Sequence, residues 1–151
     1  MNKPGQYTSN TILCQVLEDG KLPNKAHDTD AGYDLYCTSD FTVEPGEIIK
    51  HPLNIRLQIP KDTYLEITSK SGNGSKGLLV YAGIVDESYR GVPHVIAINL
   101  SKSTLKFTKG MKLAQMIPHP FRRTFLDETS EVSTETSRGV GGFGSSGGSL
   151  V

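Results

Sequence analysis

Short apolar segments, separated at near-regular intervals by glycine, proline and aspartate turns, limit this chain to a fold built from short strands. The clearest segment is NIRLQIP at 54–60, where Ile55, Leu57 and Ile59 alternate with polar residues. A period of two is typical of a half-buried strand. Roughly ten such segments follow one another, and none has the longer period of an ordinary helix. The sequence therefore predicts an all-β fold, a sandwich or barrel of the jelly-roll type.

The apolar run LLVYAGIVD at 78–86 is expected to form a hairpin with the segment 92–100, through the turn ESYRG at 87–91. A helical turn is conceivable only after Ser69, where Gly72 and Gly74 disfavour it. The remaining expected strands lie at 11–17, 33–36, 46–51, 63–68, 104–110 and 112–121.

The charges of the chain balance, with 16 basic and 16 acidic residues among 151. This balance argues against a partner role for nucleic acid or an anionic membrane surface, but it permits a small local anion site. No apolar run approaches the length of a membrane-spanning helix, and the first residues lack a signal-peptide pattern. Two cysteines make neither a disulfide framework nor a metal set. We expect reduced thiols and a cytoplasmic protein (or a nuclear one in a eukaryotic host) that is not secreted.

The composition changes near the C-terminal end. A polar, acidic stretch at 122–137 precedes the glycine-rich sequence RGVGGFGSSGG at 138–148. We expect a β core at 1–125 and, at 126–151, a polar tether with a glycine-rich tail. Arg138 and Phe143 in such a tail need an explanation, because a glycine backbone is costly to order.

The loop SKSGNGSKG at 69–77 can present backbone N–H groups and lysine charge to a phosphate. It is not a Walker A loop, because Lys76 is followed by Gly77 rather than by serine or threonine. An ordinary surface turn has the same composition. The loop alone does not decide between these readings.

Two aspartates are candidates for chemistry. Asp86 ends an apolar run, where a carboxylate can orient a water or a sugar hydroxyl, although turns commonly begin with aspartate. Tyr89 in the following turn can stack on a ligand or simply pack. Asp34 lies between two tyrosines, where it can order a hydrated metal or merely end a strand. The sequence has no nucleophile elbow and no zinc-deaminase signature.

Taken in order, five stretches resemble the five motifs of the trimeric dUTPase family: AGYDLY (31–36), SKSG (69–72), AGIVDESYRG (82–91), KGMKLAQMI (109–117) and RGVGGFGSSG (138–147). The resemblance implies a β jelly roll that assembles as a homotrimer, with each active site drawn from all three subunits. It further implies hydrolysis of dUTP to dUMP and pyrophosphate, with Mg²⁺ on the triphosphate. Such an enzyme keeps uracil out of DNA and supplies dUMP for thymidylate synthesis.

The family's roles for the third motif carry over to matching residues. Asp86 would orient the attacking water and hold the 3′-hydroxyl of the deoxyribose. Tyr89 would lie against the sugar and leave no room for a 2′-hydroxyl. The backbone of three residues before the aspartate would line the uracil slot: Gly83, Ile84 and Val85.

The other motifs would hold the phosphates and the lid. Asp34 would reach Mg²⁺ through water, while the substrate phosphates bind most of the ion. In the tail, Arg138 would grip the terminal phosphate and Phe143 would cover the uracil. The remaining phosphate contacts would come from Lys70, Ser71, Gly72, Gln115, Ser145 and Ser146.

The second motif departs from the family, since Lys70 stands where arginine is usual and Asn73-Gly74 replaces a more helix-friendly pair. Lysine is a point charge without the bidentate fork of arginine.

Two other functions remain open. One is a dCTP deaminase of the same fold, and the other is a nucleotide-sensing protein that binds without appreciable turnover.

Overall fold

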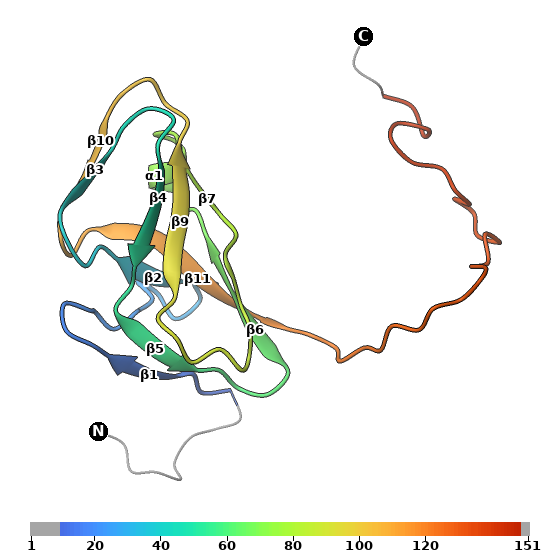
Figure 1. Cartoon of the computed structure of the whole chain (residues 1–151), viewed down its shortest axis with the longest axis horizontal. Helices are drawn as coiled ribbons and strands as arrows, with labels where there is room; N and C mark the ends of the chain where they lie inside the picture. The colour runs from blue at the N-terminus through green and yellow to red at the C-terminus, as the bar shows by residue number, and fades with distance from the viewer. Residues whose placement is uncertain (1–9, 149–151) are drawn as a thin grey trace.

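A computed structural model describes residues 10–148, which form a β barrel followed by an extended tail (Figure 1). The strands of the first half are β1 (Leu13–Val16), β2 (Tyr33–Tyr36), β3 (Phe41–Val43), β4 (Ile48–Pro52), β5 (Ile55–Gln58) and β6 (Thr63–Thr68). After the short helix α1 (Ser71–Gly74) come β7 (Leu78–Tyr81), β8 (Ile84–Val85), β9 (His94–Asn99), β10 (Leu105–Phe107) and β11 (Lys112–Pro120). The all-β prediction is confirmed.

Four sheets enclose one hydrophobic core. The largest has the strand order β2-β11-β6-β8, and the second has the order β4-β9-β7. Two-stranded sheets, β1-β5 and β3-β10, complete the barrel. Every sheet contributes fully buried residues, among them Leu35, Val43, Ile55, Leu65, Leu78, Val95 and Leu113.

The alternating segment 54–60 forms β5 as predicted. Ile55, Leu57 and Ile59 are buried, whereas Arg56 and Gln58 point to solvent. Strand β1 pairs antiparallel with β5 and covers this edge of the barrel.

The predicted hairpin of 78–86 with 92–100 is correct only for its first half. β7 pairs with β9, but the chain breaks at Ala82, and β8 pairs with β6 in the other large sheet. Ala82 adopts a φ of 51°, a left-handed conformation that ends the strand. A Cβ on Gly83 would lie 1.8 Å from the carbonyl oxygen of Ile67, so only glycine allows this crossing. The apolar run therefore spans two sheets.

Two local features were not expected. Phe41–Val43 forms β3 against β10, although the sequence there reads as a loop. The helical turn after Ser69 forms despite its glycines, because the Asn73 side chain donates to the carbonyl oxygens of Lys112 and Leu113 at 3.0 and 2.9 Å. These two bonds fasten α1 to the start of β11.

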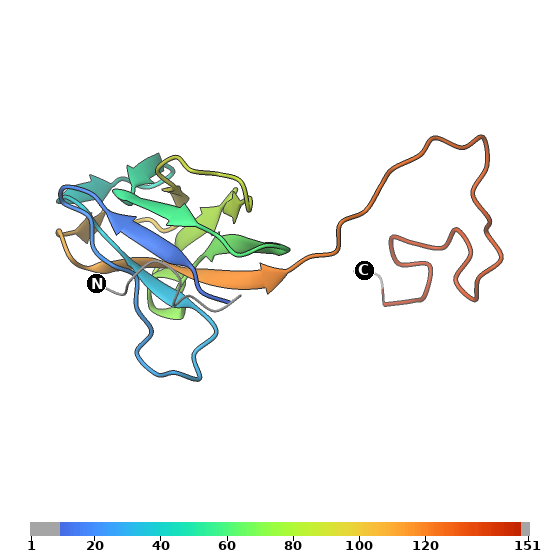
Figure 2. The same ribbon diagram turned by 90° about the horizontal axis from the view of Figure 1, so that it is seen from below.

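The tail leaves the barrel after β11 and forms no helix or strand between 121 and 148 (Figure 2).

Cys14 and Cys37 are free thiols, as expected. Among the residues that the structure describes, no helix is long and apolar enough to cross a membrane.

Candidate active site

Four of the residues predicted for the third motif line one cavity with Asp86. The cavity has a volume of about 270 Å³, and its wall includes Gly83, Ile84, Val85, Asp86 and Tyr89. Lys50 and Ile96 contribute from the neighbouring sheet. The structure thus brings the predicted base and sugar residues together; we call this cavity the hairpin slot.

One side of the slot is an unpaired strand edge. β8 is the outermost strand of its sheet, and the carbonyl of Gly83 accepts from the Ile67 N–H at 2.7 Å. Since successive residues of a strand direct their backbone groups to opposite sides, the N–H and C=O of Ile84 point away from β6. A planar base with donors and acceptors along one edge can bind there.

Asp86 follows β8 directly and is exposed. Its backbone carbonyl accepts from the Tyr89 N–H at 3.0 Å, which closes the turn. Within residues 10–148 its carboxylate makes no hydrogen bond or ion pair. Both oxygens are therefore available to a water or a ligand.

The Tyr89 ring is fixed over the turn. Its hydroxyl donates to the Val92 carbonyl at 3.2 Å, and a Cβ on Gly91 would lie 2.5 Å from the same hydroxyl. Glycine at 91 thus makes room for the ring at the mouth of the slot.

A second group of predicted residues gathers around the buried Asp34. Lys70 and Lys112 each donate to one of its carboxylate oxygens, and Lys112 Nζ lies 2.6 Å from Oδ2. Burial alone raises the pKa of Asp34, but the two lysines outweigh burial, so its pKa lies below the usual value. The carboxylate stays charged and holds two cations together. We call Asp34, Lys70 and Lys112 the lysine pair site.

Gln115 lies beside this site, opposite Asp34 in the β2–β11 pair. Its Nε2 donates to the Ser69 carbonyl at 2.9 Å. A Cβ on Gly32 would approach its Oε1 to 2.6 Å, so glycine in AGYDLY makes space for the amide. Ser71 and Gly72 lie in α1, directly after Lys70. The predicted metal residue of the first motif and the predicted phosphate residues of the second and fourth motifs are therefore neighbours.

The residues around Asp34 do not form a cage for a metal. The described part of the chain holds no group of three or more His, Cys, Asp and Glu side chains suited to a metal ion. Both oxygens of Asp34 already accept from lysines. An ion here would take most of its ligands from phosphate oxygens, with Asp34 reaching it at most through water.

The predicted tail residues lie apart from both groups. Arg138 Nε donates to the carbonyl of Gly141 at 2.8 Å, and Phe143 is fully exposed. Ser145 and Ser146 are exposed as well. None of the predicted tail or phosphate residues lines the hairpin slot. One chain therefore displays three separate parts of the expected site.

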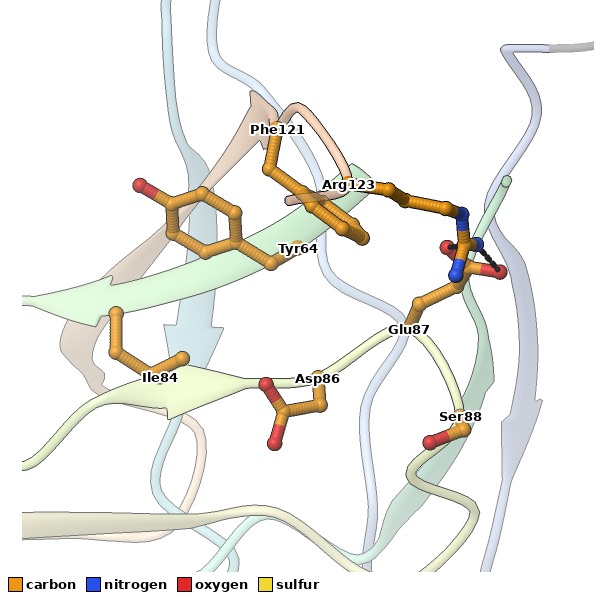
Figure 3. Close-up of a pocket in the computed structure, with 7 residues that line it drawn as sticks. All are labelled: Tyr64, Ile84, Asp86, Glu87, Ser88, Phe121 and Arg123. Atoms are coloured by element: carbon orange, nitrogen blue, oxygen red, sulfur yellow. Dashed lines mark hydrogen bonds and ion pairs between the residues drawn. The ribbon is translucent and has the colours of Figure 1, made fainter. Parts of the chain in front are cut away.

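Sequence reasoning missed several residues near these groups. Lys112 was not predicted at Asp34, and Asn73 was read only as a helix-breaking departure. A second cavity of about 400 Å³ adjoins Asp86 on its other side (Figure 3). Its remaining lining residues are Tyr64, Ile84, Glu87, Ser88, Phe121 and Arg123. Ile84, Glu87 and Ser88 belong to the third motif, but no motif marks Tyr64, Phe121 and Arg123, which strand pairing brings to the same cavity.

Comparison with known proteins agrees with this geometry. The dUTPase family model matches residues 18–147. A deoxyuridine 5′-triphosphate nucleotidohydrolase of Clostridium tetani is 40% identical over 93% of this chain and 99% of its own length.

Solved structures show the same similarity. The Staphylococcus bacteriophage 80alpha dUTPase, in a structure with dUpNHpp, has a TM-score of 0.81 at 26% identity and covers 91% of this chain and 99% of its own. A dUTPase from phage phi11 of S. aureus, described with a structural Mg(II) ion, has a TM-score of 0.74 at 26% identity and covers 81% and 98%. The chain belongs to the dUTPase family, as the family model over residues 18–147 and the 40% identical deoxyuridine 5′-triphosphate nucleotidohydrolase show.

Proposed function

We propose that this protein hydrolyses dUTP to dUMP and pyrophosphate, and that the Asp86 carboxylate orients the attacking water. The observation that carries the proposal is the position of Asp86. It stands at the end of the free edge of β8, lines the hairpin slot, and has no partner for its carboxylate within residues 10–148. A carboxylate in this position can accept a proton from water beside a bound nucleotide.

The slot favours uracil through its backbone. The N–H and C=O of Ile84 present a fixed pattern to the edge of a base, whereas the amino group of cytosine would place a donor against a donor. Each buried polar group left unpaired costs about 1–3 kcal/mol. Tyr89 lies against the sugar and excludes a 2′-hydroxyl. These contacts select a deoxyuridine nucleotide.

The lysine pair site and its surroundings bind the triphosphate. Lys70 supplies positive charge and Gln115 supplies an amide donor. In α1, Ser71 supplies its hydroxyl, and both Ser71 and Gly72 supply backbone N–H groups. Asp34 is the residue that would reach a Mg²⁺ ion through water, and such an ion on the substrate phosphates would neutralise the charge of the leaving pyrophosphate. The protein side chains position and bind the substrate, which is what phosphoryl chemistry mainly requires.

The three parts of the site meet when three subunits assemble. The outer face of the β4-β9-β7 sheet carries Ile48 and Leu79 on either side of Ile98, next to Tyr81 and Ile96. Ile48 and Leu79 are 60% and 47% exposed, which leaves an apolar face for a partner. Ile96 also lines the hairpin slot, so this face continues into the site. A neighbouring subunit on it would bring a lysine pair site toward Asp86.

The tail of a further subunit closes the site. The division into a core at 1–125 and a tether and lid at 126–151 includes residues 1–9 and 149–151, which lie outside the described residues; in the described tail, Arg138, Ser145 and Ser146 bind the phosphates and Phe143 covers the uracil. The bound nucleotide offsets the entropy lost when the glycine-rich backbone becomes ordered.

A nucleotide panel tests the proposed function. Pyrophosphate release is measured for dUTP, dCTP, dTTP and UTP with Mg²⁺, and ammonia release is measured for dCTP. We expect turnover of dUTP far above that of the other three nucleotides. Equal turnover of all four, or release of ammonia, would contradict the proposal, and tight binding of dUTP without turnover would indicate a nucleotide sensor.

A further inference from the structure

A network of ion pairs ties the root of the tail to the turn that bears Asp86. Arg123 Nη2 lies 2.8 Å from Glu87 Oε2 and 3.1 Å from Oε1, and its Nε donates to Asp62 Oδ1 at 2.8 Å (Figure 3 draws the Glu87 contact). We call Asp62, Glu87 and Arg123 the clasp. The forked guanidinium lets one side chain bind two carboxylates at once.

The clasp also fixes backbone. Glu87 Oε2 accepts from the Asp62 N–H at 2.8 Å, and the Phe121 N–H donates to the Asp62 carbonyl at 3.0 Å. Asp62 has a φ of 57°, in the left-handed region that non-glycine residues rarely adopt. The turn before β6, the turn after β8 and the end of β11 are thus joined in one arrangement.

The clasp lies partly in solvent. The side chains of Arg123 and Asp62 are 56% and 48% exposed and that of Glu87 is 27% exposed, so screening by water limits what the network contributes to folding. Its geometry bears instead on Asp86, which directly precedes Glu87 in the closed turn. The Asp86 carboxylate has no partner within residues 10–148, so its direction depends on the turn backbone that the Glu87 side chain helps to hold.

We propose that Glu87 and Arg123 are positioning residues that hold the Asp86 carboxylate in its reactive direction at the hairpin slot. The inference rests on the proposed role of Asp86. Arg123 acts through Glu87 and touches no reacting atom. Removing either side chain detaches the turn from Asp62 and the end of β11 while its internal bonds from Tyr89 and Arg90 remain, so both removals loosen it in the same way.

The test uses the full chain with Arg123→Gln, Glu87→Gln and the double variant, each assayed for kcat and KM with dUTP. A loosened catalytic group lowers kcat, and we expect a drop of about tenfold with KM changed little. Because the two residues act as a pair, the double variant should fall no further than either single one. Arg123→Lys keeps the charge without the fork and should recover only part of the rate.

Arg122→Gln is the matched control, since Arg122 is exposed and makes no hydrogen bond or ion pair within the described residues. It removes the same charge from the same segment. A kcat for Arg123→Gln equal to that of Arg122→Gln would overturn the inference, as would a change in KM alone. An active wild type with an inactive Asp86→Asn and an unaffected Arg123→Gln would contradict the clasp and leave the proposed function standing. A wild type without turnover would contradict both.

Discussion

Lys112 and Asp34 form an ion pair across β11 and β2, with Nζ 2.6 Å from Oδ2, while Lys70 donates to the other oxygen of the same carboxylate. The hydrogen bond and charge of Asp34 raise the pKa of Lys112 above its usual value. The buried aspartate therefore holds two ammonium groups side by side. At this site the chain presents two separate ammonium groups, Lys70 and Lys112, rather than one forked guanidinium.

Lys112 is accordingly expected to contribute to triphosphate binding. Replacing Lys112 with glutamine removes one of the two cations, and KM for dUTP should rise on the order of fivefold while kcat changes less. Lys112→Arg should restore the wild-type value. Steady-state kinetics at low and high salt measure the effect, which should shrink as salt screens the charge.

Lys109→Gln provides the control for this charge. Lys109 lies just before β11 and pairs with the exposed Asp19, away from Asp34. Lys109→Gln changes the net charge of the protein by the same amount as Lys112→Gln. A KM for Lys112→Gln no higher than for Lys109→Gln would show that only the lysine at 70 serves the phosphates.

Asn73 is expected to stabilise the loop that carries the phosphate residues. Asn73→Ala loses both bonds to the β11 carbonyls and should lower the free energy of unfolding by about 1–2 kcal/mol. Asn73→Asp should lower the free energy of unfolding further than Asn73→Ala does. The aspartate keeps the shape of the side chain but places a carboxylate against two carbonyl oxygens, which repel it. Urea unfolding measures both, with Ser75→Ala as a control that removes a bond internal to this turn. An Asn73→Ala protein as stable as the wild type would show that the helix needs no tether.

His51 is expected to make stability depend on pH. It is buried, its ring stacks on Phe41, and its Nε2 accepts from the Thr38 N–H at 3.0 Å, an arrangement that requires the neutral ring. Burial, with a smaller contribution from the charge of His94, lowers the pKa of His51 below 6.5. The unfolded chain therefore takes up a proton near pH 6.5 that the native protein resists.

The free energy of unfolding should consequently be highest above pH 6.5 and fall as the pH drops below this value toward the native pKa. His51→Gln should flatten the dependence below pH 6.5, and a variant of the exposed His27 serves as the control. Thermal unfolding at a series of pH values on both sides of 6.5 measures this dependence of stability on pH. An equally steep dependence in His51→Gln would assign the effect to other groups.

Much of the fold could be predicted from local pattern. The alternation of Ile55, Leu57 and Ile59 sufficed for β5, because a half-buried strand must expose every second residue. The same reasoning failed at Ala82, where an unbroken apolar run changes sheets. That change depends on one left-handed residue and on the fit of Gly83 against Ile67, and neither affects hydrophobic periodicity.

The candidate site divides in a similar way. The resemblance identified Asp86 and the slot residues, which the structure does bring together. The ion pairs of Lys112 and Arg123 were not predicted. Their partners, Asp34 and Glu87, are far away in sequence and become neighbours only through strand pairing. Ion pairs of this kind leave no local signal that sequence reasoning can read.

Shared sites predict that two inactive variants can restore each other. A chain ending before Arg138 should fold and assemble but have little activity, and Asp86→Asn should be inactive for a different reason. In co-expressed mixed trimers, some sites combine an intact Asp86 from one subunit with an intact tail from another. Random mixing gives about a quarter of wild-type activity.

A site built within one subunit gives a different result. No chain in the mixture carries both intact parts, so activity would stay at the level of the two variants alone. Full activity of the truncated chain by itself would show that the tail takes no part in the reaction.

The Asp86→Asn variant probes the proposed role of the Asp86 carboxylate in orienting the attacking water. Asparagine keeps the shape of the side chain but cannot accept a proton from water. We expect kcat for dUTP to fall by about a thousandfold in this variant. The dissociation constant for dUTP, measured by calorimetry, should stay within about threefold of the wild-type value. A turnover rate for Asp86→Asn close to that of the wild type would contradict the assignment of the water-orienting group to this residue.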